Sequence, residues 1–283
     1  MTFQTIEVRP LAGALGAEVG NIDLSAPLSN QMRDEIHQAF LDNLVIVFRD
    51  QKLTPEKQVE IAGLFGKPAI YPFLQGLDGA PEVHELLKTA EDEVNFGGNW
   101  HSDTAYRECP DMGTLLYAHE VPDVGGDTLF TNMYLAYDAL SDGMKEMLKG
   151  LTAIYSSEKG YDGKRAEKMK SLDGLKDAVQ AEIETFESEH PVVRTHPETG
   201  QKALYVSKSH TLRFKDMTVE ESTPLIDYLS TFAVLPEFTC RVDWQPQTLV
   251  IWDNRCTKHL AVDDYAGQRR RMHRVTVEGV KPL

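Results

Sequence analysis

Apolar side chains in the first quarter of the chain recur at the three- and four-residue spacing of amphipathic helices. In residues 29–40 they form one face, and Ser29 or Asn30 is placed to cap the first turn. A second helix is indicated over 54–66, where a threonine-proline pair matches a cap followed by proline at the first helical position and a glycine ends the pattern. We therefore expect two helices close to the N-terminus.

A third helix is expected later in the chain. Thr218 and Glu221 match a capping box, in which each side chain bonds the backbone N–H of the other residue. Pro224 must then kink or restart this helix, because proline has no N–H to donate to the preceding turn.

The remaining apolar runs are short and are bounded by turn-forming residues, which is typical of strands. The run Leu44–Phe48 is apolar throughout, as in a buried strand. Further strands are expected at Thr114–His119, Val192–Thr195, Ala203–Ser207, Phe238–Trp244, Thr248–Trp252 and Met272–Val277.

Helices cluster early and in insertions, while short strands recur to the C-terminus. This order favours a mainly β fold with helical insertions, an antiparallel sandwich or jelly roll, over a doubly wound sheet. No repeat, low-complexity tract or linker divides the chain, so we expect a single domain over residues 1–283. The polar segment 156–189, rich in Lys, Glu and Asp, is interpreted either as a solvated face or as a mobile lid over a site.

The composition limits the partners and the location. Lys and Arg number 29 and Asp and Glu number 44, so the formal net charge is −15, which argues against an open nucleic-acid-binding surface. No apolar run is long enough to span a membrane, and the N-terminus lacks the pattern of a signal peptide. The three cysteines cannot form a disulfide framework, so a reduced cytoplasm is the expected location.

His101 and Asp103 are two residues apart, and in a strand such positions point to the same face. They could present an imidazole and a carboxylate to one metal ion, although such pairs also occur by chance, as at His196 and Glu198. His259, where a predicted strand gives way to a turn-rich loop, could complete the set if the fold brings it close. Two His and one carboxylate form the facial arrangement that leaves open positions on Fe(II).

Two other interpretations of His259 remain open. Cys256 and His259 have the spacing of half a structural zinc site, but no second Cys or His pair completes it. His259 could equally be a core histidine with its hydrogen bonds satisfied. If His259 does bind a metal ion, Cys256 should lie near that ion and become a target of oxidation.

The densest basic run of this acidic chain is 268–274. If a strand begins at Arg270, then Arg270 and Arg274 share one face, and two inward guanidinium groups could hold two small anions side by side. A surface stripe of charges is the alternative. Thr128, which follows a glycine pair and begins a predicted strand, adds a candidate hydroxyl, although the same residues are typical of an ordinary hairpin turn.

Three segments together carry a family resemblance. They are WHSDTAYRECPDMGTLLYAHEVPDVGGDTLF, HPVVRTHPETGQKALYV and WDNRCTKHLAVDDYAGQRRRMHRVTVEG. With them the chain resembles the taurine dioxygenase/TfdA family of Fe(II)- and 2-oxoglutarate-dependent oxygenases over about residues 6–282. The resemblance implies a double-stranded β-helix, that is, a jelly roll with helical insertions, and an enzyme that uses Fe(II), 2-oxoglutarate and O₂.

The resemblance also implies roles for individual residues. The iron ligands would be His101, Asp103 and His259. Arg270 would pair with the distal carboxylate of 2-oxoglutarate, with Thr128 beside it, and Arg274 would bind an anionic group of the substrate. The positions that line the pocket in this family are occupied here by Trp100, Thr104, Tyr106 and Tyr205.

One position departs from the family pattern. Tyr71 stands where taurine-oxidising members carry a His that helps to hold the sulfonate, so taurine is not the expected substrate. Other members oxidise alkyl sulfates, other sulfonates and aryloxyalkanoates, and the hydroxylated product fragments. We therefore expect hydroxylation of a small anionic organic substrate with release of succinate and CO₂, by a homo-oligomer (dimer or tetramer). A non-catalytic anion-binding jelly roll and a zinc-dependent hydrolase are the alternatives.

Overall fold

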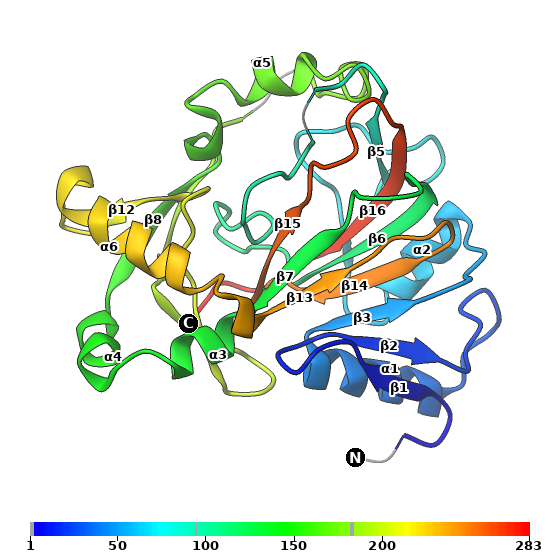
Figure 1. Cartoon of the computed structure of the whole chain (residues 1–283), viewed down its shortest axis with the longest axis horizontal. Helices are drawn as coiled ribbons and strands as arrows, with labels where there is room; N and C mark the ends of the chain where they lie inside the picture. Colours follow the sequence, from blue (N-terminus) through cyan, green and yellow to red (C-terminus); the bar gives the residue numbers. More distant parts are fainter. Residues whose placement is uncertain (1–2, 94, 182–183) are drawn as a thin grey trace.

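Two β-sheets pack face to face at the centre of the molecule (Figure 1). The computed structural model describes residues 3–93, 95–181 and 184–283. The strands of the larger sheet are β1 (Glu7–Pro10), β2 (Ala17–Gly20), β3 (Val45–Phe48), β4 (Pro68–Ala69), β5 (His84–Lys88), β6 (Gly113–Glu120), β14 (Leu249–Asp253) and β16 (Arg270–Val277). The smaller sheet consists of β7 (Thr128–Asn132), β13 (Thr239–Val242) and β15 (Thr257–Ala261).

The order of the strands brings distant parts of the sequence together. In the larger sheet it is β1-β2-β3-β14-β6-β16-β4, with β5 also paired to β16, and in the smaller sheet it is β13-β7-β15. Of the strand pairs in the described residues, only β2 and β3 run parallel. Two facing sheets whose strands are almost all antiparallel, in a mainly β molecule, are the jelly-roll architecture that the sequence predicts.

Smaller elements surround this framework. The peripheral strands are β8 (Thr152–Ser156), β9 (Glu187–Pro191) and β12 (Thr211–Phe214) in one sheet and β10 (Val193–Thr195) and β11 (Lys202–Leu204) in another. The α-helices are α1 (Asn30–Asn43), α2 (Pro55–Ala62), α3 (Met133–Asp138), α4 (Asp142–Leu148), α5 (Arg165–Lys170) and α6 (Val219–Phe232). Two 3₁₀ turns are η1 (Lys159–Tyr161) and η2 (Pro236–Phe238). No helix among these described residues is long and apolar enough to cross a membrane.

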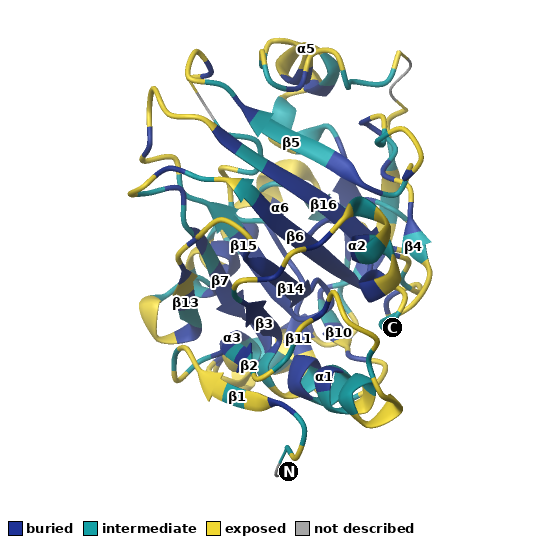
Figure 2. Cartoon of the chain, turned by 90° about the vertical axis from the view of Figure 1, so that its right-hand side faces the viewer, coloured by how far each residue is buried: buried dark blue, intermediate teal, exposed yellow. Residues whose placement is uncertain are grey.

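The central strands of the larger sheet are buried on both faces (Figure 2). In β3, Val45 and Val47 belong to the core between the two sheets, whereas Ile46 and Phe48 belong to a second core that includes residues of α1 and α2. Successive side chains of a strand point to opposite faces, so both faces of β3 must be apolar. This double burial explains the unbroken apolar run in the sequence.

Helices α1 and α2 begin where the sequence predicts but do not both end there. The side chains of Ser29 and Thr54 accept the expected capping hydrogen bonds. Helix α2 ends at Ala62 rather than at Gly66. The expected end was wrong because the last residues form tighter turns, in which the amide of Phe65 donates to the carbonyl of Ala62 at 3.0 Å.

Helix α6 has the predicted capping box, with both hydrogen bonds between Thr218 and Glu221 present. Of the two effects expected of Pro224, a kink or a restart, the helix does not restart there but runs from Val219 to Phe232 as one element. Pro224 and Glu220 are exposed, so water can satisfy the Glu220 carbonyl that loses its usual amide donor.

The polar segment 156–189 leaves the framework and returns to it. Strands β8 and β9 pair with each other along their whole length, so the chain between them forms an excursion that carries η1 and α5 (Figure 1). Several residues of this excursion, including Arg165, Met169 and Leu175, are buried, so it is not simply a solvated face.

Candidate active site

His101, Asp103 and His259 come together between the two sheets. One donor atom from each lies within 4.8 Å of the donor atoms of the other two. A pair of backbone hydrogen bonds joins the two histidines, from the His101 amide to the His259 carbonyl at 3.0 Å and from the His259 amide to the His101 carbonyl at 2.8 Å. The fold therefore assembles a set of two imidazoles and one carboxylate, which suits Fe(II).

The local structure around these residues differs from the sequence-based expectation. His101 makes a single bridge to His259 and is not part of a regular strand, and Asp103 lies in a turn in which Thr104 has a φ of 48°. His259 lies in the middle of β15 rather than in a loop. The turn-forming residues 254–256 are the whole connection between β14 and β15, so the chain re-enters a strand two residues before His259.

Asp103 is held by hydrogen bonds to buried neighbours. Its Oδ2 accepts a hydrogen bond from the Thr114 hydroxyl at 2.7 Å, and this hydroxyl accepts one from Asn254 Nδ2 at 2.8 Å. Asn254 Oδ1 in turn accepts from the Asp103 amide at 3.3 Å. The arrangement leaves Oδ1 of Asp103 facing His101 Nε2 at 3.7 Å, with no hydrogen bond between them. Oδ1 accepts no hydrogen bond from the described residues, although Arg274 Nη1 lies 3.8 Å away, so it can bind a metal cation.

Replacing Thr114 with valine should weaken metal binding. The Thr114→Val variant removes the hydrogen bond that orients Asp103, and partners of this kind are worth about 10–100-fold in metal affinity. It should also cost about 1–3 kcal/mol of stability, since the Asn254 amide loses its acceptor. Thr131→Val is the matched control, because Thr131 is equally buried on β7 and donates to the Ala233 carbonyl. If both variants lose metal affinity alike, the positioning role of Thr114 is refuted.

The protonation states of the site suit a cation. Burial lowers the pKa of His259 to about 3, so its ring is neutral at physiological pH. Burial alone would raise the pKa of Asp103, but the nearby His259, His101 and Arg274 outweigh it and hold this pKa well below its ordinary value. The His101 Nδ1–H donates to the Asn99 carbonyl at 2.6 Å, which leaves the lone pair on Nε2. The donor set thus fits a divalent metal ion.

Two adjoining cavities open on this cluster. The main cavity has a volume of about 540 Å³ and the inner cavity about 40 Å³. His101, Asp103 and Arg274 line both cavities, whereas His259 lines the inner one. The inner cavity is closed in by residues of both sheets, and the main cavity is bounded in part by the excursion 156–189.

Arg270 and Thr128 both line the inner cavity, as the resemblance implies. Two nitrogens of the Arg270 guanidinium, Nε and Nη2, are buried and have no hydrogen-bond partner among the described residues. Thr128, which follows two glycines with positive φ, accepts a hydrogen bond from Trp244 Nε1 at 3.0 Å. A buried, unpaired guanidinium carries a large desolvation cost, so this cavity is suited to a carboxylate.

Arg274 lies where the two cavities meet. Its guanidinium lies over the Tyr71 ring at 4.0 Å and within 3.8 Å of Asp103 Oδ1, while Nε and Nη2 are buried without partners among the described residues. Thr104, Tyr106 and Tyr71 also line the main cavity. A second anion can therefore be held beside the metal-binding cluster, in the cavity that has room for an organic molecule.

Two residues expected in the pocket do not line either cavity. Tyr205 lies in the core, where its ring packs against that of Tyr155 at 5.7 Å. Trp100 meets Ser209 through its backbone carbonyl. A motif alone does not show whether the side chains of Trp100 and Tyr205 point into the cavity or away from it. Conversely, His210 and Phe96 do line the main cavity, and no pattern in the sequence singled them out.

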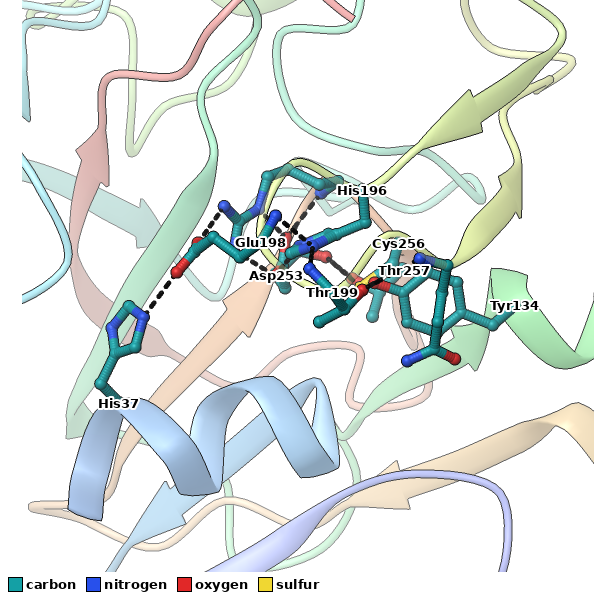
Figure 3. Close-up of polar contacts among 10 residues, drawn as sticks. His37, Tyr134, His196, Glu198, Thr199, Asp253, Cys256 and Thr257 are labelled. Carbon is teal, nitrogen blue, oxygen red and sulfur yellow. Dashed lines mark hydrogen bonds and ion pairs between the residues drawn. The ribbon is translucent and has the colours of Figure 1, made fainter. Parts of the chain in front are cut away.

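A second cluster of His, Asp and Cys lies outside the cavities. His196, Asp253 and Cys256 place their donor atoms within 4.8 Å of one another (Figure 3). The Asp253 carboxylate already accepts hydrogen bonds from the Arg255 amide and guanidinium, and from His196 Nε2 at 3.0 Å. The other ring nitrogen of His196, Nδ1, accepts hydrogen bonds from the backbone amides of Glu198 and Thr199. With its lone pairs occupied and a guanidinium beside it, this cluster is a structural network rather than a metal site.

The position of Cys256 bears on the alternatives for His259. Its sulfur belongs to the cluster of Figure 3, whereas the His259 side chain belongs to the set with His101 and Asp103. The two ends of the Cys-x-x-His motif therefore serve different clusters, and half a zinc site is not formed. The Cys256 sulfur contacts the Asp253 carbonyl at 3.9 Å and lies near Tyr134, and it is not one of the three donors of the triad near which it was expected.

The network of Figure 3 should contribute to stability in a pH-dependent way. Arg255 and His196 hold the pKa of Asp253 at about 2, below its ordinary value of 3.8, although burial opposes this. A carboxyl group whose pKa is lower in the folded state than in the unfolded state stabilises the fold at pH values above the unfolded-state pKa. This stabilisation is lost as the pH falls through the folded-state pKa. Asp253→Asn should therefore lower the free energy of unfolding by about 3–5 kcal/mol at neutral pH, and the difference from the wild type should shrink below about pH 4.

Urea unfolding at several pH values measures this difference. Asp243→Asn is the control, because Asp243 pairs with Arg49 at the surface, and such pairs contribute about 0–1 kcal/mol. Equal losses in the two variants would contradict a stabilising role for the buried network.

Comparisons with known proteins agree with this geometry. The family model described as "Taurine catabolism dioxygenase TauD, TfdA family" matches residues 7–276. An alkylsulfatase of Acinetobacter baylyi is 34% identical over 278 residues, which cover 98% of this chain and 86% of that protein. An alpha-ketoglutarate-dependent sulfate ester dioxygenase of Pseudomonas putida is 33% identical, with coverage of 98% and 91%. The structure of AAD-2 in complex with Mn(II) and N-oxalylglycine superimposes with a TM-score of 0.79 at 30% identity, over 99% of each chain.

The chain therefore belongs to the TauD/TfdA family. It is an Fe(II)- and 2-oxoglutarate-dependent dioxygenase with a jelly-roll fold, and O₂ is its oxidant. A non-catalytic anion-binding protein and a zinc hydrolase, the two alternatives considered from the sequence, are thereby set aside.

Proposed function

We propose that His101, Asp103 and His259 hold the iron of this dioxygenase. In the same proposal, Arg270 and Thr128 bind the distal carboxylate of 2-oxoglutarate in the inner cavity, and Arg274 binds an anionic substrate in the main cavity. One observation carries this division of labour. Two buried guanidinium groups flank the donor set, one in the inner cavity and one shared with the main cavity, and Nε and Nη2 of each have no hydrogen-bond partner among the described residues.

The remaining chemistry follows from this division. Fe(II) held by these residues would supply the redox chemistry that uses O₂ to couple the oxidative decarboxylation of 2-oxoglutarate, to succinate and CO₂, with hydroxylation of the substrate. Arg270 fixes the far end of 2-oxoglutarate and Arg274 fixes the head of the substrate. Because both anchors are rigid and buried, they determine which C–H bond lies over the reacting centre. Tyr71 supports the second anchor, since its ring packs under the Arg274 guanidinium.

The proposed substrate is a small organic anion, and sulfate esters are the class to test first. The two curated relatives described above are named for sulfate ester chemistry. Sulfonates and aryloxyalkanoates also present oxygens to which a guanidinium can bind bidentately. Hydroxylation of the carbon that bears the sulfate oxygen forms a C–O bond in place of a C–H bond. The adduct then loses sulfate and leaves an aldehyde, which explains fragmentation. Tyr71 in place of a His argues against taurine.

A panel of anionic substrates tests the proposed function. Purified protein with Fe(II), ascorbate and 2-oxoglutarate is supplied with alkyl sulfates, alkanesulfonates or aryloxyalkanoates, and succinate and O₂ consumption are measured. We expect substrate-dependent succinate from at least one class. If no class raises succinate above the background without substrate, the proposed substrate chemistry is wrong.

We also propose that the chain works as one domain in the cytoplasm, as a dimer or tetramer, with residues 156–189 as a lid. The cytoplasmic location is supported by three cysteines that are all free. The lid is supported by the residues that this excursion contributes to the main cavity. Light scattering measures the oligomeric state. Limited proteolysis of 156–189 should slow when substrate is bound, and equal cleavage rates with and without substrate would contradict a lid.

A further inference from the structure

Besides Arg274, a second buried guanidinium faces the main cavity. It belongs to Arg165, a residue that the sequence motifs did not assign to the site. Arg165 is the first residue of α5, in the excursion 156–189, and only 2% of its surface is exposed. It lines the main cavity together with Arg274, which comes from β16. A charged side chain so deeply buried needs compensating contacts.

Aromatic rings and the backbone hold the Arg165 guanidinium in place. Its central carbon lies 4.2 Å from the ring centre of Tyr161, 4.4 Å from that of Phe73 and 5.2 Å from that of Tyr106. Nε and Nη2 donate to one acceptor, the Ser157 carbonyl, at 2.9 and 2.7 Å. The group is therefore fixed before any ligand binds, which lowers the entropy cost of using it.

The third nitrogen of Arg165 is unused. Nε and Nη2 donate to Ser157, whereas Nη1 has no hydrogen-bond partner among the described residues and is not sealed from solvent. The nearest carboxylate, that of Glu158, is 3.8 Å from Nε, too far for a hydrogen bond. Two N–H groups of a rigid cation are thus available at the wall of the cavity.

The two guanidinium groups of the main cavity are separate anchors. Arg274 packs on Tyr71, and Arg165 packs on Phe73, while the rings of Tyr71 and Phe73 contact each other at 5.3 Å. The aromatic pair thus lies between the two cations. Phe96, Met169 and Leu172 supply apolar lining in the same cavity. One end of a ligand can meet Arg274 while its apolar chain leads to Arg165.

We propose that Arg165 is a specificity-determining residue, which binds an oxygen acceptor at the end of the substrate remote from the headgroup, and a carboxylate best. This assignment rests on the proposed function, in which Arg274 holds the headgroup. The preferred substrates are then small organic molecules with an acidic group at each end. A charged hydrogen bond in such a buried place is worth about tenfold or more in affinity.

Arg165 has one competing explanation, that it only fastens the excursion to the core through Ser157 and the rings. The two explanations make different predictions. If Arg165 has only a structural role, its loss changes the affinity for every ligand of the main cavity alike. If Arg165 determines specificity, its loss changes the affinity only for ligands that carry the second acidic group.

Calorimetry with matched ligands separates the two. The protein is loaded with Mn(II) and N-oxalylglycine, so that no turnover occurs, and titrated with an alkyl sulfate or with the same sulfate carrying a terminal carboxylate in place of the methyl group. We expect the wild type to bind the carboxylated ligand about tenfold more tightly. Arg165→Met, which places an uncharged apolar side chain beside the rings, should remove this preference and leave the affinity for the alkyl sulfate nearly unchanged.

Lys168→Met is the matched control. Lys168 lines the same cavity from α5, but its side chain is 49% exposed and pairs with Asp162 at 3.6 Å. This variant should retain the preference. If Arg165→Met does not fold, Arg165→Gln replaces it with the same expected result.

Three outcomes overturn the proposal: no preference in the wild type, a preference that survives the loss of Arg165, or an equal loss of affinity for both ligands. The result does not depend on turnover, so it is distinct from a failure of the substrate panel. A preference can be found even if no sulfate ester yields succinate.

Discussion

Replacing His101 with alanine should abolish metal-dependent activity. The side chain contributes one of three donor atoms that lie within 4.8 Å of each other, and the remaining pair cannot complete a facial site. Since loss of an outer hydrogen-bond partner alone costs about 10–100-fold in metal affinity, loss of a ligand should cost more than about a hundredfold. The visible charge-transfer band of the protein with Fe(II) and 2-oxoglutarate, recorded without O₂, should disappear together with succinate formation.

A matched histidine variant controls for non-specific effects. His37 lies on α1 and pairs with Glu198 at 2.7 Å, and it lines neither cavity (Figure 3). His37→Ala should retain the band and full iron content. A normal band in the His101→Ala protein would show that the iron binds elsewhere, and the site assignment would be wrong.

Replacing the two arginines in turn should separate cosubstrate binding from substrate binding. Arg270→Met should raise the dissociation constant of 2-oxoglutarate by about 10–100-fold, because a charged hydrogen-bond pair is worth about 1.5–3 kcal/mol. Arg274→Met should leave 2-oxoglutarate binding unchanged and raise the KM of the organic substrate by a similar factor. Each guanidinium lies over an aromatic ring, Trp244 for Arg270 and Tyr71 for Arg274, and methionine places an uncharged apolar side chain beside the same ring.

The two constants are measured separately. Anaerobic titration of the charge-transfer band gives the affinity for 2-oxoglutarate, and initial rates of succinate formation give the KM. Arg9→Met is the control, because Arg9 is exposed on β1 and should change neither constant. If Arg274→Met weakens 2-oxoglutarate and Arg270→Met weakens the substrate, the assignment of the two cavities is reversed.

The two arginines illustrate what a local pattern can predict. Residues four apart in a strand share a face whatever the fold, so the pairing of Arg270 with Arg274 followed from one assumption, that the segment is a strand. Strand β16 confirms it, and both residues are buried. The sequence could not decide which face turns inward, because both faces carry charged and apolar residues.

The metal-binding set illustrates the opposite case. His101 and Asp103 do meet, but through a bridge and a turn rather than through the regular strand that suggested them. His259 joins them because β15 lies beside the segment at His101, more than 150 residues earlier in the chain. Spacing within a motif carries no information on such pairing, and only the three segments together, as a family resemblance, indicated it.

The sequence by itself determined the local elements and the available side-chain chemistry of this protein. These are a mainly β chain, its capped helices, the strand that carries two arginines, and the types of residue that can bind iron and anions. These features depend on backbone periodicity and on side-chain chemistry, which act over a few residues. The tertiary structure alone decided that Tyr205 is a core residue, that Cys256 belongs to a different cluster from the triad, and that Arg165 lines the main cavity. Such placements depend on how sheets and excursions pack, and packing is a property of the whole chain.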